Sequence, residues 1–234
     1  MENAHIVKSF DDDLTRIENL ILEMGGLVES QITGALEALL SGDEERATEI
    51  RAADKAIDAL ESKVDEQALT VLALRQPMAA DLRAVVCALK VAGNLERTGD
   101  YAKNIAKRTV VLSDITLPGS APKTLKRMGA LVQQMVADVL NAYVAKDVAM
   151  ADELILRDEE VDQIHNTLFR ELLTYMLEEP RNITPCMHLL FIAKNLERMG
   201  DHVTAIAEQI HYVVTGAVPP DDRPKADETS VLPL

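Results

Sequence analysis

The sequence predicts an all-α protein made of two tandem three-helix bundles that are related by internal duplication, with six long helices in all. Three observations lead to this prediction. Apolar residues recur with the helical period along most of the 234 residues, aromatic residues make up only 3%, and one heptapeptide occurs twice. The apolar content is Leu, Ala, Val, Ile and Met, a composition that favours helices over strands.

The helical period divides the chain into six segments separated by turn signals. SGDEE at residues 41–45 and the segments around Pro77 and Pro180 interrupt the pattern within each half. The predicted helices cover about residues 9–40, 43–75, 79–112, 122–145, 147–177 and 185–214.

Prolines and a glycine gather in SDITLPGSAPK, at residues 113–123, and mark the connection between the halves. The proline-rich, acidic end of the chain has the composition of a disordered segment. We therefore expect four regions: a first three-helix bundle at 1–113, a linker at 114–121, a second three-helix bundle at 122–215 and a flexible C-terminal tail at 216–234.

The duplication is clearest in two copies of one motif. NLERTGD occupies residues 94–100 and NLERMGD occupies residues 195–201, and eight of the fourteen residues that begin at each copy are identical. Residues 54–58 and 158–162, ahead of the turn in each half, also align as DxxxD. The repeating unit is therefore a whole bundle of about 110 residues.

Each copy of the motif holds two acids four residues apart, Glu96 with Asp100 and Glu197 with Asp201. Residues at this spacing lie on one face of a helix, about 5–6 Å apart, where like charges are mildly destabilising. The acids continue the apolar stripe of their helix, so we expect them to face a neighbouring helix. The glycine inside each motif leaves room for that neighbour.

The preceding helix of each half supplies a second acid pair. If the turn at Pro77 is short, the two helices are antiparallel and Asp58 comes level with Glu96 and Asp100; the same reasoning brings Asp162 level with the second pair. The candidate metal ligands are therefore Glu96, Asp100, Glu197, Asp201, Asp54, Asp58, Asp158 and Asp162.

Crowded carboxylates are neutralised either by protonation or by bound cations. Oxygen ligands suit Mg²⁺, Mn²⁺ and Ca²⁺, and ferric iron or zinc also accept carboxylates. The alternative is ordinary ion pairing, in which Lys194 neutralises Glu197, Lys103 neutralises Asp100, and Arg97 and Arg198 reach acids of other helices.

Composition narrows the classes of function. A net charge of −15 argues against binding to nucleic acid or to anionic lipid. We expect no signal peptide and no membrane span, hence a soluble cytoplasmic protein, and the two cysteines read as buried thiols. The sequence contains no glycine-rich phosphate loop and no recognisable Ser-His-Asp or Cys-His pattern. We therefore expect neither catalytic residues nor an organic cofactor.

The duplicated bundle, QPMAADLR at residues 76–83 and the two LERxGD motifs resemble the PhoU family of phosphate-transport accessory regulators, over nearly the whole chain. The resemblance implies a cytoplasmic, all-helical, often dimeric protein that is not an enzyme. It implies negative modulation of the high-affinity phosphate importer and of phosphate-starvation signalling, through contacts with the importer ATPase and the phosphate-sensing histidine kinase. It also implies iron, zinc or other metal clusters at the E/DxxxD motifs.

One departure from the duplicated pattern and two rival functions remain. Asp81, Leu82 and Arg83 have no clear counterpart in the second half, which reads Asn-Ile-Thr at residues 182–184, so the halves need not be equivalent.

A carboxylate-bridged metal enzyme on a helical bundle is the first alternative function, and it requires an open metal position and a substrate pocket. A metal-free helical scaffold with salt-bridged acid pairs is the second.

Overall fold

The computed structural model describes residues 2–217, with side chains from residue 10 onward. Within these residues all regular structure is helical, which confirms the all-α prediction. The six long helices are joined by short turns, one of which contains the short 3₁₀ helix η1. The elements are α1 (Glu2–Ser41), α2 (Glu44–Arg75), α3 (Ala80–Leu112), α4 (Ala121–Ala145), α5 (Val148–Glu178), η1 (Pro180–Asn182) and α6 (Ile183–Thr215).

The helix ends lie where local chemistry places them. Asp43 and Asp147 cap α2 and α5, because each side chain accepts a hydrogen bond from the backbone N–H three residues on, at 2.8 and 3.1 Å. Two predicted starts were too late. The first helix begins at Glu2, because no breaker precedes residue 9, and α6 begins at Ile183, because a proline such as Pro185 is tolerated in a first turn.

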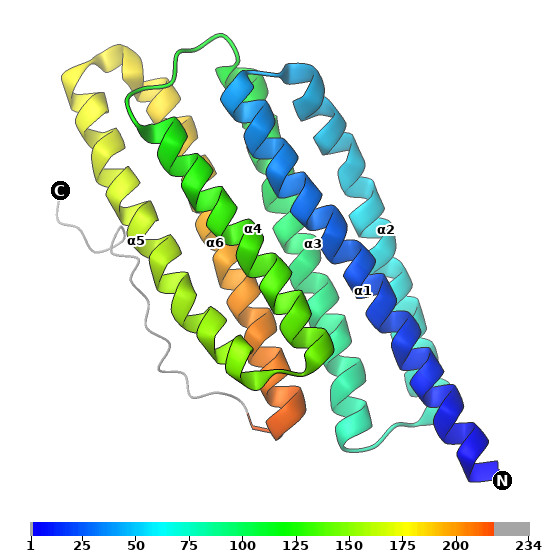
Figure 1. Cartoon of the computed structure of the whole chain (residues 1–234). Coiled ribbons are helices and arrows are strands. Elements are labelled where there is room, and N and C mark those ends of the chain that lie inside the picture. The colour runs from blue at the N-terminus through cyan, green and yellow to red at the C-terminus, as the bar shows by residue number, and fades with distance from the viewer. Residues whose placement is uncertain (1, 218–234) are drawn as a thin grey trace.

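The helices lie side by side with α3 and α6 at the centre (Figure 1). The helices α1 and α4 pack against this central pair and against each other, while α2 and α5 lie at opposite edges. Each half is thus a three-helix unit, and the halves meet along α3–α6 and α1–α4. The predicted tail, residues 216–234, lies outside the described residues from 218 onward.

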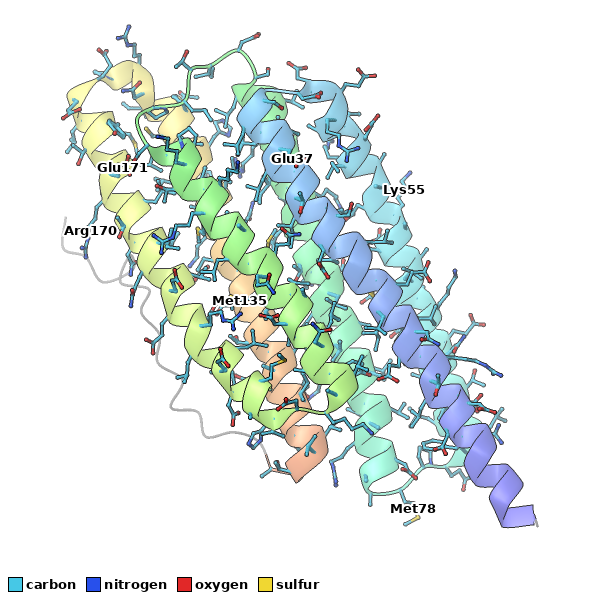
Figure 2. All side chains as sticks on the ribbon, viewed as in Figure 1. Glu37, Lys55, Met78, Met135, Arg170 and Glu171 are labelled. Carbon is cyan, nitrogen blue, oxygen red and sulfur yellow. The ribbon has the colours of Figure 1, made fainter. Side chains whose placement is uncertain are left out.

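The core is aliphatic, with methionine filling its interior. Met135, in the middle of α4, is fully buried, whereas Met78 in the turn between α2 and α3 is 80% exposed (Figure 2). Gly25 and Gly129 allow α1 and α4 to approach, because a Cβ at either position would overlap a leucine side chain of the other helix. Cys87 and Cys186 are buried free thiols, as expected.

None of the helices in residues 2–217 has both the length and the apolar character that a membrane crossing requires.

Candidate functional site

A first acidic cluster lies between the antiparallel helices α2 and α3, halfway along the molecule. It comprises Asp54 and Glu61 of α2 with Glu96 and Asp100 of α3. Glu61 lies outside the repeated DxxxD and is not among the predicted ligands. Burial and the charges of Asp65, Asp58 and Asp100 raise its pKa. The predicted member Asp58 is exposed and lies at the margin of the cluster.

A lysine neutralises this cluster from within. The Lys103 ammonium donates hydrogen bonds to Asp54 of α2 and, at 2.8 Å, to Asp100 of its own helix. The Asp54 side chain is only 4% exposed, whereas that of Lys103 is 37% exposed. Lys55, next to Asp54 in the chain, points away from the helices and takes no part (Figure 2). The Asp100–Lys103 pair considered as an alternative to metal binding is therefore formed, and it extends across two helices.

Gly99 permits the close approach that the cluster requires. A Cβ at this position would lie 2.9 Å from Ile57 Cδ1 and 3.6 Å from Asp54 Oδ1. The buried side chain of Gln31 in α1 also meets this point. With its amide oriented to satisfy both ends, Gln31 donates to the Gly99 carbonyl at 3.3 Å and accepts from the Asp54 N–H at 3.0 Å. Three helices are thus tied together beside the acids.

The remaining carboxylates of the first cluster repel one another. Burial raises the pKa of Glu96 above its ordinary value, and the neighbouring Asp100 raises it further through its charge and a hydrogen bond. Arg97 opposes this effect only weakly, because its guanidinium lies 3.5 Å from Glu96 and 3.8 Å from Asp100 and is largely exposed. A single ammonium therefore leaves the first cluster with excess negative charge.

This excess charge predicts that Glu96→Gln stabilises the protein at pH 7. An acid whose pKa is raised by folding binds its proton more tightly in the native state, so the wild type loses stability as the pH rises through the window from about 4.5 to the raised value. The advantage of Glu96→Gln should therefore appear across this window and persist above it. Urea unfolding at a series of pH values measures the difference.

The matched control is Glu37→Gln, an acid on the exposed face of α1 (Figure 2). Because the Glu37 side chain is exposed, this change should alter the free energy of unfolding far less than Glu96→Gln. Equal pH profiles for the two variants would contradict the proposed crowding at Glu96.

A second acidic cluster occupies the equivalent position between α5 and α6. Asp158, Asp162 and Glu197 are each 6% exposed, and Asp201 is partly buried. Lys194 donates to Glu197 at 2.7 Å, which is the other lysine pair that the sequence allowed. Asp158 lies directly over Gly200, where a Cβ would overlap its carboxylate oxygen. The glycine of the second motif therefore has the same use as Gly99.

Side chains within and next to the motifs connect the two halves. His202 Nδ1 lies 2.8 Å from Asn94 Oδ1 across the α3–α6 contact, and its ring lies 5.6 Å from that of Tyr101. Burial lowers the pKa of His202; the charge of Asp201 opposes this shift, and the charges of Arg97 and Arg198 add to it. His202 thus contributes to the interface between the two halves.

The two clusters contain the carboxylate donors that a metal site needs, but their side chains are not arranged closely enough around one point to bind an ion. Carboxylate oxygens suit hard divalent cations. Among the side chains of residues 10–217, however, no three from His, Cys, Asp or Glu converge closely enough to hold one ion. In the first cluster the space between the Asp54 and Asp100 carboxylates holds the ammonium of Lys103. The assignment of eight carboxylate ligands remains a prediction.

These features define a class of protein before any comparison: a duplicated helical bundle with an acidic cluster between the second and third helices of each half. The PhoU domain model matches this chain twice, over residues 21–109 and 125–210. The chain therefore belongs to the PhoU family.

Relatives match over almost the full length. The chain is 44% identical over 232 residues to the phosphate-specific transport system accessory protein PhoU homolog of Rhizobium meliloti (strain 1021), covering 99% of this chain and 98% of that protein. It is 46% identical over 226 residues to the protein of the same description from Caulobacter vibrioides (strain NA1000 / CB15N), covering 97% and 98%.

Solved structures share the fold. The crystal structure of PhoU from Pseudomonas aeruginosa superposes with a TM-score of 0.85 at 36% identity, covering 89% of this chain and all of that one. The phosphate transport system regulatory protein PhoU from Streptococcus pneumoniae gives a TM-score of 0.84 at 32% identity, covering 90% and 99%.

Proposed function

We propose that this protein is a cytoplasmic accessory regulator of phosphate uptake, which lowers the activity of the high-affinity phosphate importer and of the phosphate-starvation signalling pathway. The observation that carries the proposal is the extent of the match. Both halves match the family domain, and relatives described as accessory proteins of phosphate-specific transport systems align over nearly their whole length. Fold alone would not support a function, but the double domain match and the identity to relatives over nearly the full length add a specific link.

The role is regulatory rather than enzymatic. A cavity of about 80 Å³ between the halves is lined mainly by apolar side chains. Its one thiol, Cys87, has a pKa raised to about 12 by burial, so it stays protonated and is a poor nucleophile at neutral pH. The acidic clusters lie elsewhere, between α2 and α3 and between α5 and α6.

The chain would regulate phosphate uptake by binding partner proteins. We assign them as the ATPase of the phosphate importer and the phosphate-sensing histidine kinase, contacted by a homodimer of this chain. The net charge of −15 favours partner surfaces with basic patches, and such contacts weaken as salt rises.

Partner binding is tested by measuring the affinity of the purified chain for each of the two proteins. We expect saturable binding that weakens as salt rises from 50 to 500 mM, on the order of tenfold or more. Bovine serum albumin, another acidic protein, should give no such binding. Failure to bind either partner at low salt would rule out this part of the proposal.

A divalent cation at the acidic clusters is the second part of the proposal. The ligands in the second half would be Asp158, Asp162, Glu197 and Asp201, whose carboxylate oxygens suit a hard divalent cation. Its role would be structural or regulatory, at the contact between α5 and α6.

Elemental analysis of protein purified without chelator, followed by Mn²⁺ titration, tests this second part. Glu197→Gln with Asp201→Asn should reduce the number of bound ions, and Glu208→Gln, farther along α6, should not. Identical binding by both variants, or an absence of bound metal throughout, would contradict it. Partner binding is scored separately, so either part can fail alone.

A further inference from the structure

Three large apolar side chains at the start of α6 are left exposed. Ile183, Met187 and Phe191, here called the α6 stripe, lie four residues apart and therefore on one side of the helix. They are 47%, 41% and 48% exposed, and Val111 near the end of α3 is 50% exposed. Adjoining apolar side chains of this size on a surface are typical of a place that another molecule covers.

Two contacts place Val111 and the α6 stripe together. Asn94 of α3 contacts His202 of α6, and Arg108 of α3 contacts His188 of α6. A step of fourteen residues along α3, from 94 to 108, thus matches a step of fourteen back along α6, from 202 to 188. The two helices are antiparallel, so the last turns of α3, with Val111, lie beside the first turns of α6.

The stripe lies on a side of the helix pair that the other described helices leave open. The helices α1 and α4 pack against one side of the α3–α6 pair, while α2 and α5 lie at its edges (Figure 1). Among residues 2–217 no further helix packs on α3 or α6. The exposed stripe is therefore available to a partner.

A partly buried arginine lies beside the stripe. The guanidinium carbon of Arg108 lies 4.3 Å from the centre of the Phe191 ring, and its Nη1 lies 3.1 Å from Nδ1 of His188. Burial lowers the pKa of Arg108, and burial together with the charge of Arg108 lowers the pKa of His188. Among residues 10–217 Arg108 forms no ion pair with a carboxylate. An incoming carboxylate would supply the charge-assisted hydrogen bonds that this guanidinium lacks.

The charge of α3 is opposite in sign to that of the chain. The helix has six Lys and Arg against three Asp and Glu, whereas the whole chain has 24 against 39. Lys107 is exposed next to Arg108 and adds positive charge at the same end of the helix. A symmetric dimer through this face would bring two equal basic patches together, which disfavours a second copy as the occupant.

We propose that this face docks an acidic segment of a partner protein, whose apolar side chains cover the α6 stripe and whose carboxylates pair with Arg108 and Lys107. The inference rests on the proposed function and adds the surface and the partner chemistry. Phenylalanine, methionine and arginine are the residue types that are enriched at the centres of interfaces. The acidic remainder of the chain repels such a segment, so the charge pattern also determines where it docks.

The duplication supplies a matched control at the other end of the helix pair. Because the motifs are 101 residues apart, Ile183, Phe191 and Arg108 correspond to Leu82, Lys90 and Gln209. That end has neither the aromatic ring nor the arginine. Leu82 is 41% exposed, as is Met187, so Leu82→Ala removes a comparable apolar side chain away from the proposed contact.

The test measures the affinity of the full chain for the purified importer ATPase and for the purified sensor kinase. Phe191→Ala and Arg108→Gln should each weaken the binding of at least one of these proteins about tenfold or more. Arg108→Gln should also make that binding less dependent on salt, and Arg108→Lys should retain part of it. Leu82→Ala and Lys55→Gln, which removes an exposed cation of α2, should change the affinity far less.

A cross-link identifies the segment that is bound. Benzoylphenylalanine placed at Met187 is irradiated in the complex, and mass spectrometry of the product should show a partner peptide rich in Asp and Glu. Circular dichroism confirms that each variant is helical, and Met187→Ala replaces Phe191→Ala if that variant has lost helix.

Each outcome decides the proposal. Weaker binding with Phe191→Ala and Arg108→Gln, but not with the controls, supports it. Wild-type affinity in both variants, or a cross-link to a basic peptide, overturns it and leaves the proposed function intact. Failure of the wild type to bind either protein overturns both. A dimer that Phe191→Ala dissociates in sedimentation, or Phe191-dependent binding to vesicles of phosphatidylglycerol and phosphatidylcholine, assigns the face to another occupant and also overturns it.

Discussion

Replacing Gly200 by alanine is expected to destabilise the protein by about 1–3 kcal/mol, the range typical of an overpacked contact. The added Cβ would overlap the carboxylate of Asp158, which is 6% exposed and packed between α5 and α6. To relieve the overlap, either this short side chain must rotate within a tight site or the two helices must separate. The change in the free energy of unfolding, measured in urea, gives the magnitude.

Two other glycines provide a graded control. Gly26 has no atom within 4 Å of an added Cβ, so Gly26→Ala should stabilise the protein by about 0.5–1 kcal/mol through helix propensity. Gly99→Ala should fall between the two, because its Cβ would lie 2.9 Å from the movable end of Ile57. If all three variants were equally stable, close approach at the motif glycines would have no energetic importance.

Lys103→Met is expected to lower the free energy of unfolding by about 1–3 kcal/mol at pH 7, because it leaves a buried acceptor group without its partner. Asp54 is the group affected, since its side chain is 4% exposed and is bonded by the Lys103 ammonium. Methionine keeps most of the length of the lysine side chain, so the loss reports the ammonium rather than the packing.

A double-mutant cycle distinguishes this pair from an ordinary surface pair. Asp54→Asn should remove much of the effect of Lys103→Met, giving a coupling energy of about 1 kcal/mol or more. Arg127→Met, which breaks the exposed α4–α5 pair with Glu160, should change stability by only about 0.2–1 kcal/mol. Additive effects at positions 54 and 103 would show that the bond contributes little.

Helix positions followed from the sequence because local signals determine them. Apolar periodicity, the capping aspartates Asp43 and Asp147, and the prolines at each turn all act within a few residues of where they stand. The arrangement of the two halves is different. The α3–α6 contact depends on pairs such as His202 with Asn94, which are 108 residues apart and carry no mutual signal in a single sequence.

The acidic clusters were only partly predictable for a geometric reason. The ExxxD spacing correctly placed Glu96 and Asp100 toward α2, but a reading limited to the repeated DxxxD favoured the exposed Asp58 over Glu61. A seven-residue spacing from Asp54 would have indicated Glu61, because that spacing stays in line with the buried stripe of α2.

The ammonium between the helices could not be found from spacing alone. The sequence suggests a pair between Lys103 and Asp100, three residues away, but it does not give the register of α2 against α3. That register decides whether the lysine reaches Asp54. Gln31 is a similar case, because it comes from α1 and joins the site only through the packing of a third helix.

Phosphate uptake in a bacterium that lacks its own PhoU protein tests the central claim most directly. Expression of this chain should lower the rate of [³²P]phosphate uptake in phosphate-rich medium and repress a phosphate-starvation reporter, both toward the levels of the parent strain. Expression of the destabilised Gly200→Ala chain at the same level should do so less completely. If folded wild-type protein accumulates and neither uptake nor reporter activity changes, the chain is not a regulator of phosphate import.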